Sequence, residues 1–329
     1  MNDFHTETPA GHREPGGTFL LAGSGFHHRM YFAGLPVLQA GELTEEPPER
    51  VAWLLHDETG FGTAEDVRDT AFPDELDQLL REVDPARVTA LAVTGHGAGN
   101  APRLLAEHAG RLTALRAVFL GLVDSEDWEI SWIRHGDITP LLEAYPELER
   151  LEVRGSAGLE LRPVTHERLK VLRFESGGLP GTVVRAVGAS TFPALEHLEL
   201  WLGEENYGGD STRGDLDGIL SGTGLPALRR LGLCDSEQQD EVAAAVAAAP
   251  VVSRLEELSL GMGTLTDRGA EALLSGQPLS HLRVLDLRHH FLTDAMMARV
   301  RDALPRVTVD LEEQDSPEDD GWMYVAVSE

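Results

Sequence analysis

Residues suited to acid–base or metal chemistry gather around Asp286, because His289 and His290 follow it within four positions and Glu257 lies in the same part of the chain. A histidine beside a carboxylate can move protons near neutral pH, and both side chains bind metals. Zinc, however, needs three or four convergent ligands that are themselves hydrogen-bonded. Paired charges of this kind are also common as plain surface charge. A metal-dependent or acid–base enzyme built on Asp286, His289 and His290 is therefore the alternative interpretation, and we predict no catalytic residue, no metal and no cofactor.

Two further motifs could carry chemistry, and neither has the full pattern that the chemistry needs. Residues 94–100, TGHGAGN, lack the Lys-Ser/Thr pair of a phosphate loop and the spacing of a dinucleotide-binding turn, so we interpret them as a flexible turn. Cys234 is the only cysteine, which excludes an intrachain disulfide and suits a reducing compartment. A lone cysteine is usually a buried small hydrophobe, and no nucleophile elbow surrounds any serine or cysteine.

An internal repeat sets the elements that would position these residues. The pattern L-x-x-L-x-L occupies residues 255–260 and recurs 27 residues later at 282–287. Its second leucine position is found at Leu91, Val118, Leu151, Leu172, Leu198, Leu231, Leu258 and Leu285, with a degenerate last copy at residues 307–309. Stretches with helical spacing lie between the copies, and several begin near an aspartate suited to N-capping: Asp137, Asp240, Asp267 and Asp294. One such unit cannot bury its own apolar face, so the spacing predicts a stack of strand–loop–helix units around one core.

These units resemble leucine-rich repeats of the long, ribonuclease-inhibitor-like kind, and residues 265–274, LTDRGAEALL, match the helical half of that repeat. The resemblance implies an α/β horseshoe with a parallel concave sheet and convex helices. The segments EISWI (129–133), FESGGLP (174–180), LEHLELWLG (195–203) and LDLRHHFL (285–292) are similar to an uncharacterised family of bacterial leucine-rich-repeat proteins. That narrower resemblance implies no established activity.

One position departs from the family's repeat, which places an asparagine three residues after the last leucine of the strand. The equivalent positions here hold His96, Val123, Ser156, Gly177, Gly203, Ser236, Gly263 and His290. We therefore predict that backbone and mixed polar hydrogen bonds hold these turns, and that His290 has a structural role.

The repeat divides the chain into four parts. Residues 1–48 are expected to be a largely disordered or flap-like extension, with an aromatic segment at 26–38 that could form a strand or hairpin. Residues 49–87 are an N-terminal cap region, with a strand at 51–55 and a helix at 71–83. Residues 88–311 form the solenoid of about eight repeats. Residues 312–329 are an acidic tail whose apolar stretch, 322–325, either covers the last repeat or stays disordered.

Composition excludes several classes of partner. The 329 residues carry 56 acidic and 27 basic side chains, a net charge of −29, and a surface of that sign repels nucleic acid and anionic membranes. The longest apolar run, 242–252, is too short to span a bilayer. The first residues lack the basic and apolar parts of a signal peptide. We expect a cytoplasmic protein, and its oligomeric state stays open.

The predicted function is a protein-binding scaffold or adaptor. Residues that alternate with the core leucines should face the concave side, where Trp201 is expected as an exposed anchor, or else packed on Tyr207 of its own loop. Two acidic, aromatic insertions, 124–133 and 204–210, account for the two 33-residue spacings. The predicted binding residues are Trp128, Trp132, Arg154, Arg173, Glu175, Glu199, Trp201, Tyr207, Arg230, Asp286 and Arg288. The partner is expected to be a protein or peptide, and the acids of this surface favour a basic one.

Overall fold

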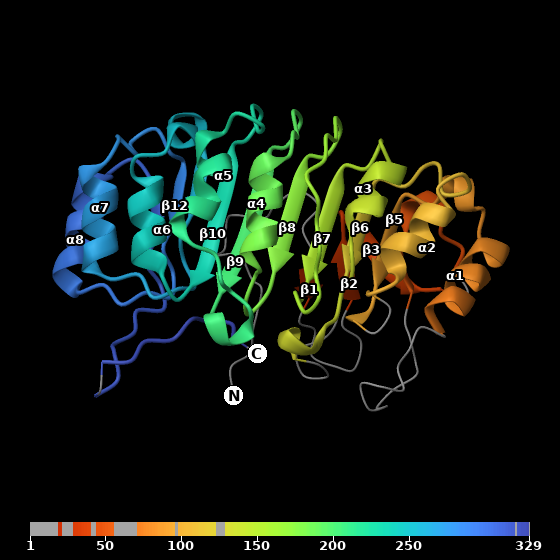
Figure 1. Cartoon of the computed structure of the whole chain (residues 1–329), viewed down its shortest axis with the longest axis horizontal. Helices are drawn as coiled ribbons and strands as arrows, with labels where there is room; N and C mark the ends of the chain where they lie inside the picture. The colour runs from red at the N-terminus through yellow and green to blue at the C-terminus, as the bar shows by residue number, and fades with distance from the viewer. Residues whose placement is uncertain are drawn as a thin grey trace.

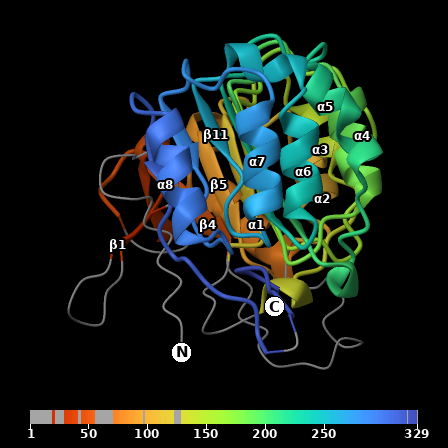
Figure 2. The same cartoon turned by 90° about the vertical axis from the view of Figure 1, so that its left-hand side faces the viewer.

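The computed structural model describes residues 19–21, 29–40, 44–55, 71–95, 98–122, 129–319 and 321–328. Their strands form one 13-stranded sheet in chain order from β1 to β13. The first three strands pair antiparallel, and the pairings from β3 to β13 are parallel. Helices cover one face of the sheet (Figures 1 and 2). The fold is the α/β leucine-rich-repeat solenoid that the sequence predicts.

The strand and helix bounds follow the predicted alternation. The strands are β1 (Phe19–Leu21), β2 (Arg29–Phe32), β3 (Leu35–Gln39), β4 (Ala52–Leu55), β5 (Ala90–Val93), β6 (Ala117–Leu120), β7 (Arg150–Arg154), β8 (Val171–Glu175), β9 (His197–Gly203), β10 (Arg230–Ser236), β11 (Glu257–Ser259), β12 (Val284–Asp286) and β13 (Thr308–Asp310). The α-helices are α1 (Ala71–Glu82), α2 (Ala101–Glu107), α3 (Thr139–Ala144), α4 (Gly181–Ala189), α5 (Asp217–Ser221), α6 (Gln239–Val246), α7 (Asp267–Ser275) and α8 (Asp294–Ala303). The short 3₁₀ turns are η1 (Pro48–Arg50), η2 (Pro85–Arg87), η4 (Ile130–Trp132), η5 (Glu205–Tyr207), η6 (Arg213–Leu216) and η7 (Pro250–Arg254).

The register of the sheet confirms the repeat alignment residue by residue. The second leucine positions pair in one continuous row from Leu91 on β5 to Val309 on β13. The same row continues before residue 88, through Trp53 on β4 and Leu38 on β3. A one-residue slip would turn every core side chain to the other face of the sheet, so the leucine spacing is what fixes this pairing.

Leucines of each repeat fill the space between the sheet and the helices. On β9 and just before it, Leu195, Leu198 and Leu200 are each fully buried, and they belong to one core cluster that extends through the solenoid. Each fully buried side chain of this size contributes roughly 1.5–3 kcal/mol relative to an exposed one. Because neighbouring repeats share this core, the stability of each unit depends on the units beside it.

Two of the predicted N-capping aspartates, Asp240 and Asp267, bond to the next repeat instead of capping their own helix, whereas Asp137 accepts from the Thr139 N–H at the start of its own helix, α3, at 2.9 Å. Thr266 and Thr293 are the N-caps of α7 and α8. Asp240 accepts hydrogen bonds from the Thr266 backbone N–H at 2.8 Å and from its hydroxyl at 2.6 Å. Asp267 accepts in the same way from Thr293, at 2.9 and 2.8 Å. These aspartates therefore bind successive convex helices to one another, which corrects the predicted role.

Mixed polar bonds replace the asparagine ladder, as predicted. Nδ1 of the fully buried His290 accepts from the Leu292 N–H at 3.2 Å, so Nε2 carries the proton and donates to the Leu311 carbonyl at 3.3 Å. The hydroxyl of Ser156 donates to the Gly178 carbonyl of the next repeat at 2.7 Å. At Gly203 (φ +68°) a Cβ would overlap the carbonyl of Gly177, so only glycine allows the two turns to pack.

An N-terminal hairpin of β2 and β3 occupies the first part of the face opposite the helices, which we call the concave face. It is present where the sequence allows a strand or hairpin at 26–38. Phe32 is fully buried against alanines of β4, β5 and β6, and its ring meets Phe119 edge-on at 5.7 Å. The concave face from β7 onward therefore carries the polar side chains. None of the helices within the described ranges is long and apolar enough to cross a membrane.

Candidate functional site

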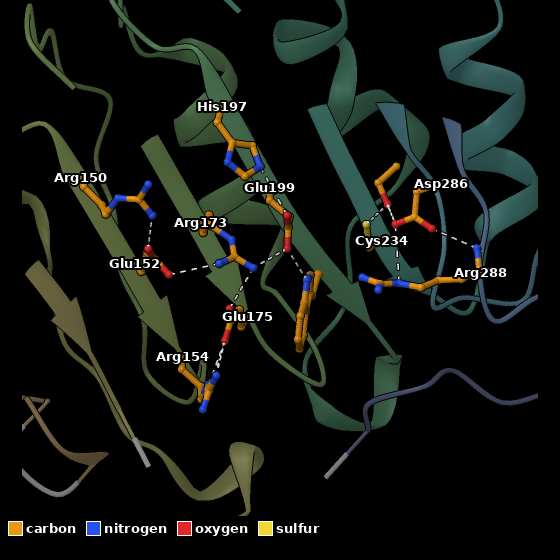
Figure 3. Close-up of polar contacts among 12 residues, drawn as sticks. Arg150, Glu152, Arg154, Arg173, Glu175, His197, Glu199, Cys234, Asp286 and Arg288 are labelled. Atoms are coloured by element: carbon orange, nitrogen blue, oxygen red, sulfur yellow. Dashed lines mark hydrogen bonds and ion pairs between the residues drawn. The ribbon is translucent and has the colours of Figure 1, made fainter. Parts of the chain in front are cut away.

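Charged side chains of β7, β8 and β9 form one connected ion-pair network on the concave face (Figure 3). We call it the concave network, and it comprises Arg150, Glu152, Arg154, Arg173, Glu175, His197 and Glu199. Arg173 is at its centre because the parallel register places Glu152 and Glu199 on either side of it. Its guanidinium lies 3.2 Å from Glu152, 2.8 Å from Glu199 and 3.1 Å from Glu175. Four of the predicted binding residues thus lie together.

The network satisfies its own charges inside the protein. The Glu152 side chain is fully buried, and Arg150 contacts it at 2.6 Å. Burial alone would raise the pKa of Glu199, but the charges and hydrogen bonds of Arg173 and His197 outweigh it and hold that pKa well below its usual range. Losing one partner of such a buried pair leaves an uncompensated charge. These side chains therefore position one another tightly.

A second polar group continues along the same face on β10, β11 and β12. The Cys234 thiol lies 3.2 Å from the Ser259 hydroxyl, which donates to Asp286 at 2.9 Å. The Arg288 guanidinium lies 3.6 Å from Asp286. Burial, then the Glu199 charge, raises the pKa of Cys234 well above its usual value, so the thiol stays protonated and is a poor nucleophile. Burial likewise raises the pKa of Asp286.

Trp201 is buried, which corrects the expectation of an exposed anchor. Its side chain is 8% exposed, and its indole N–H donates to Glu199 at 2.9 Å. It belongs to a small apolar cluster with Ile130, Cys234 and Val327, which come from three other parts of the chain. Trp201 therefore links the concave network to a segment at the C-terminal end.

The C-terminal segment Tyr324–Ser328 lies along the edge at which the strands end, which we call the exit edge. In Figure 1 the chain returns from α8 along this edge, toward the middle of the sheet. The Val325 and Val327 side chains are buried, at 4% and 9% exposure. The backbone of Ser328 packs so closely on Gly177 that a Cβ at position 177 would overlap the Ser328 carbonyl oxygen. The apolar tail thus reaches well beyond the last repeat, which the sequence did not predict.

Three equivalent turn residues hold this segment. Asp235, Met262 and His289 lie 27 residues apart, and each has a positive φ, of 58°, 70° and 50°. Asp235 is the residue before the last of β10, whereas Met262 and His289 come three residues after the ends of β11 and β12. His289 Nε2 lies 3.1 Å from the Tyr324 carbonyl oxygen. The Met262 carbonyl accepts from the Ala326 N–H at 2.8 Å, and Asp235 Oδ1 accepts from the Val327 N–H at 2.9 Å.

The left-handed conformation costs a residue other than glycine about 1 kcal/mol. Such strain persists where the surrounding structure requires it, often at functional sites. Three repeats in succession therefore bear this cost at the positions that contact the tail. No pattern of residue types marks these positions in the sequence, because aspartate, methionine and histidine share no side-chain chemistry.

Asp235 is the least satisfied acid on this edge. It has no exposed surface, and its Oδ2 has no hydrogen-bond partner within the described part of the chain. Burial raises its pKa well above the usual value, against the hydrogen bond from Val327, and the Glu204 charge raises it further. Burial, then repulsion from Glu237, also raises the pKa of Glu204, which the backbone N–H of Val325 partly offsets.

The three residues of the alternative enzyme site do not converge. Asp286 is engaged with Ser259 and Arg288, whereas the His289 ring stacks edge-on with Tyr324 at 5.4 Å. His290 forms the buried turn bonds described above. No group of three or more histidine, cysteine or acidic side chains that could hold a metal occurs among the residues that the structure covers.

The remaining predicted binding residues are dispersed. Trp132, in η4, is 56% exposed, and Tyr207, in η5, is half-buried. In Figure 1 these two turns lie below the sheet. Arg230 starts β10 beside His197 of β9. Trp128 lies outside the described residues.

No protein-family model matches this sequence, and no curated protein sequence matches it. Among solved structures, a Bacteroides fragilis protein is similar over 77% of this chain and 73% of its own, with 27% identity and a TM-score of 0.70. A TLR13–ssRNA13 complex matches over 72% of this chain and 35% of its own, with 14% identity and a TM-score of 0.34. A Leptospira interrogans leucine-rich-repeat protein matches over 73% and 80%, with 13% identity and a TM-score of 0.23.

Proposed function

We propose that this protein is a protein-binding scaffold that takes an extended polypeptide segment along its exit edge, beside the concave network. The observation that supports this most is that the edge already holds one extended segment, Tyr324–Ser328. Backbone groups of the segment supply its bonds to Met262, Asp235 and His289. Recognition through the main chain is a general way in which proteins bind extended peptides.

Aromatic side chains at the same edge supply contact area for a partner. Trp132 and Trp322 are the exposed large hydrophobic residues of the described chain, at 56% and 54%. Tryptophan is enriched at the residues that dominate binding energy in protein interfaces. Trp128, which lies outside the described residues, shares the insertion 124–133 with Trp132, and Tyr207 lies in the insertion 204–210. We include both in the proposed surface, together with Arg154, Arg173, Glu175, Glu199, Arg230, Asp286 and Arg288.

The charge of the chain favours a basic protein or peptide as the partner. A net charge of −29 attracts positive partners and repels nucleic acid and anionic membranes. Electrostatic attraction of this kind raises the rate of encounter more than the affinity. We further propose a cytoplasmic location and a place among the long, ribonuclease-inhibitor-like leucine-rich repeats.

Affinity capture from an extract of the source cells, followed by mass spectrometry, tests this function. The full chain would be compared with Trp132→Ala and with Arg299→Ala, which removes an exposed ion pair on the convex face. We expect proteins that are retained by the wild type and by Arg299→Ala to be depleted at least tenfold by Trp132→Ala. Equal retention by all three proteins would contradict the proposed surface.

A further inference from the structure

The segment on the exit edge belongs to the chain itself, so the proposed peptide site is occupied from within. We call the surface beneath it the tail-binding edge, formed by Trp201, Glu204, Asp235, Met262 and His289. Val327 and Trp201 belong to one apolar cluster, and the Val325 N–H bonds to Glu204. The chain reaches this edge from β13 on the last repeat, and no helix or strand occurs in the described residues between them, 311–319 and 321–323.

The tail fits this edge in shape but not in charge. Its valines fill the apolar part, yet it presents only backbone N–H groups to the carboxylates of Asp235 and Glu204. Oδ2 of Asp235 is buried with no hydrogen-bond partner in the described ranges, and Glu237 adds a further negative charge beside Glu204. Residues 310–329 contain eight acids and no base. A buried carboxylate without a cation is an unfavourable arrangement.

We propose that the tail-binding edge receives an extended, apolar peptide segment of a partner that carries an arginine or lysine, and that Tyr324–Ser328 is the internal competitor which this segment displaces. This rests on the proposed function and names the partner's chemistry. The partner segment repeats the backbone bonds to the three turn residues. Its cation pairs with Asp235, and this is the contact that the tail cannot make.

A tethered competitor is effective even when its own contacts are weak. The tail is covalently attached to the last repeat, so it competes at the effective concentration of a short linker, on the order of millimolar. A free peptide with the tail's sequence therefore binds the closed protein poorly. A charge-assisted hydrogen bond to a carboxylate is roughly twice as strong as a neutral one, which gives the basic segment the advantage that displacement needs.

Fluorescence anisotropy with two labelled peptides tests this proposal. One peptide has the sequence of residues 321–328, and the other carries the substitution S328R, one residue from the amide that Asp235 binds. The receptor is the full chain, either as wild type or as Ala326→Pro, which removes the N–H donor to the Met262 carbonyl. Val327→Asp is a second release variant, used if circular dichroism shows that Ala326→Pro does not fold. Ser316→Asp is the control for Val327→Asp, because it adds the same charge on an exposed part of the tail.

We expect both peptides to bind Ala326→Pro at least tenfold more tightly than the wild type or Ser316→Asp. The S328R peptide should bind at least fivefold more tightly than the parent peptide, and Asp235→Asn in the release variant should abolish that difference. Equal binding to the wild type and the release variants would overturn the proposal that the tail is a competitor. Equal binding of the two peptides would overturn the proposal that the partner segment carries a basic residue. The proposed function fails separately, if capture of cellular proteins is independent of Trp132.

Discussion

The Val327 N–H donates a 2.9 Å hydrogen bond to the Asp235 carboxylate across 92 residues of sequence. This bond joins the C-terminal segment to the end of β10, and Val327 belongs to the apolar cluster of Trp201. It also buries an acid completely beside a second acid, Glu204. The bond therefore stabilises the tail, while the buried carboxylate weakens the same arrangement.

Asp235→Asn is expected to raise the unfolding free energy of the protein at neutral and alkaline pH. The pKa of Asp235 is raised in the folded state, so the folded protein binds this proton more tightly than the unfolded chain, whose aspartates titrate near 3.9. The stability that Asp235 contributes is thus fully present below its pKa in the unfolded chain, and it is lost as pH rises through its pKa in the folded protein. Asparagine stays neutral, tolerates a positive φ and can still accept from Val327.

Urea unfolding at pH 5 and at pH 8 measures this effect. The gain in unfolding free energy from Asp235→Asn should be larger at pH 8 than at pH 5. Asp302→Asn, at an exposed position of α8, is the matched control for removal of one negative charge. A gain that is the same at both pH values would mean that Asp235 does not titrate as proposed.

Asp240→Ala should destabilise the solenoid by about 2 kcal/mol. Its carboxylate accepts from Thr266 and from the Gly269 N–H at 3.0 Å, so its loss leaves two backbone donors at the start of α7 without their partner. Chemical denaturation followed by circular dichroism would measure the change. Glu241→Ala, one residue later, removes only an exposed ion pair with Arg268 and should cost less than about 1 kcal/mol.

Arg173→Ala should cost about 3–5 kcal/mol, the range for breaking a buried ion pair, because three glutamates lose the cation that they share. The unfolding free energy of Arg173→Lys should lie between those of the wild type and Arg173→Ala, since a lysine keeps the charge but cannot contact several carboxylates in one plane. Thermal unfolding of the three proteins would rank them. A loss for Arg173→Ala no greater than that for the exposed convex Arg299→Ala would show that the network is not coupled.

The sequence predicts the fold in detail because the core permits few alternatives. Leu198 and Leu231 must stack in one row for neighbouring repeats to share a core, so their spacing predicts the strand register. It also predicts the turn role of His290, since that residue replaces a known hydrogen-bonding position. Asp240 and Asp267 are harder to interpret, because their carboxylate oxygens accept hydrogen bonds from the following repeat, as Asp240 does from Thr266.

The exit edge could not be predicted for a different reason. The tail is held by backbone groups, at Ala326 and Val327, which leave no pattern in the residue types. Trp201 is at an alternating, outward-facing position, and it is buried in a cluster with residues as distant in the sequence as Ile130 and Val327. Sequence spacing specifies what each repeat presents, but not which remote segment covers it.

Replacement by alanine should therefore destabilise the protein at Trp201 but not at Trp132. Trp201→Ala removes a buried ring and the donor to Glu199, so we expect a loss of roughly 3 kcal/mol in unfolding free energy and faster chymotrypsin cleavage after Trp322 or Tyr324. Trp132→Ala removes an exposed ring and should leave unfolding and tail cleavage within error of the wild type. If Trp201→Ala leaves cleavage of the tail unchanged, the contact between Trp201 and Val327 does not hold the segment in place, and the bonds to Met262 and Asp235 must do so alone.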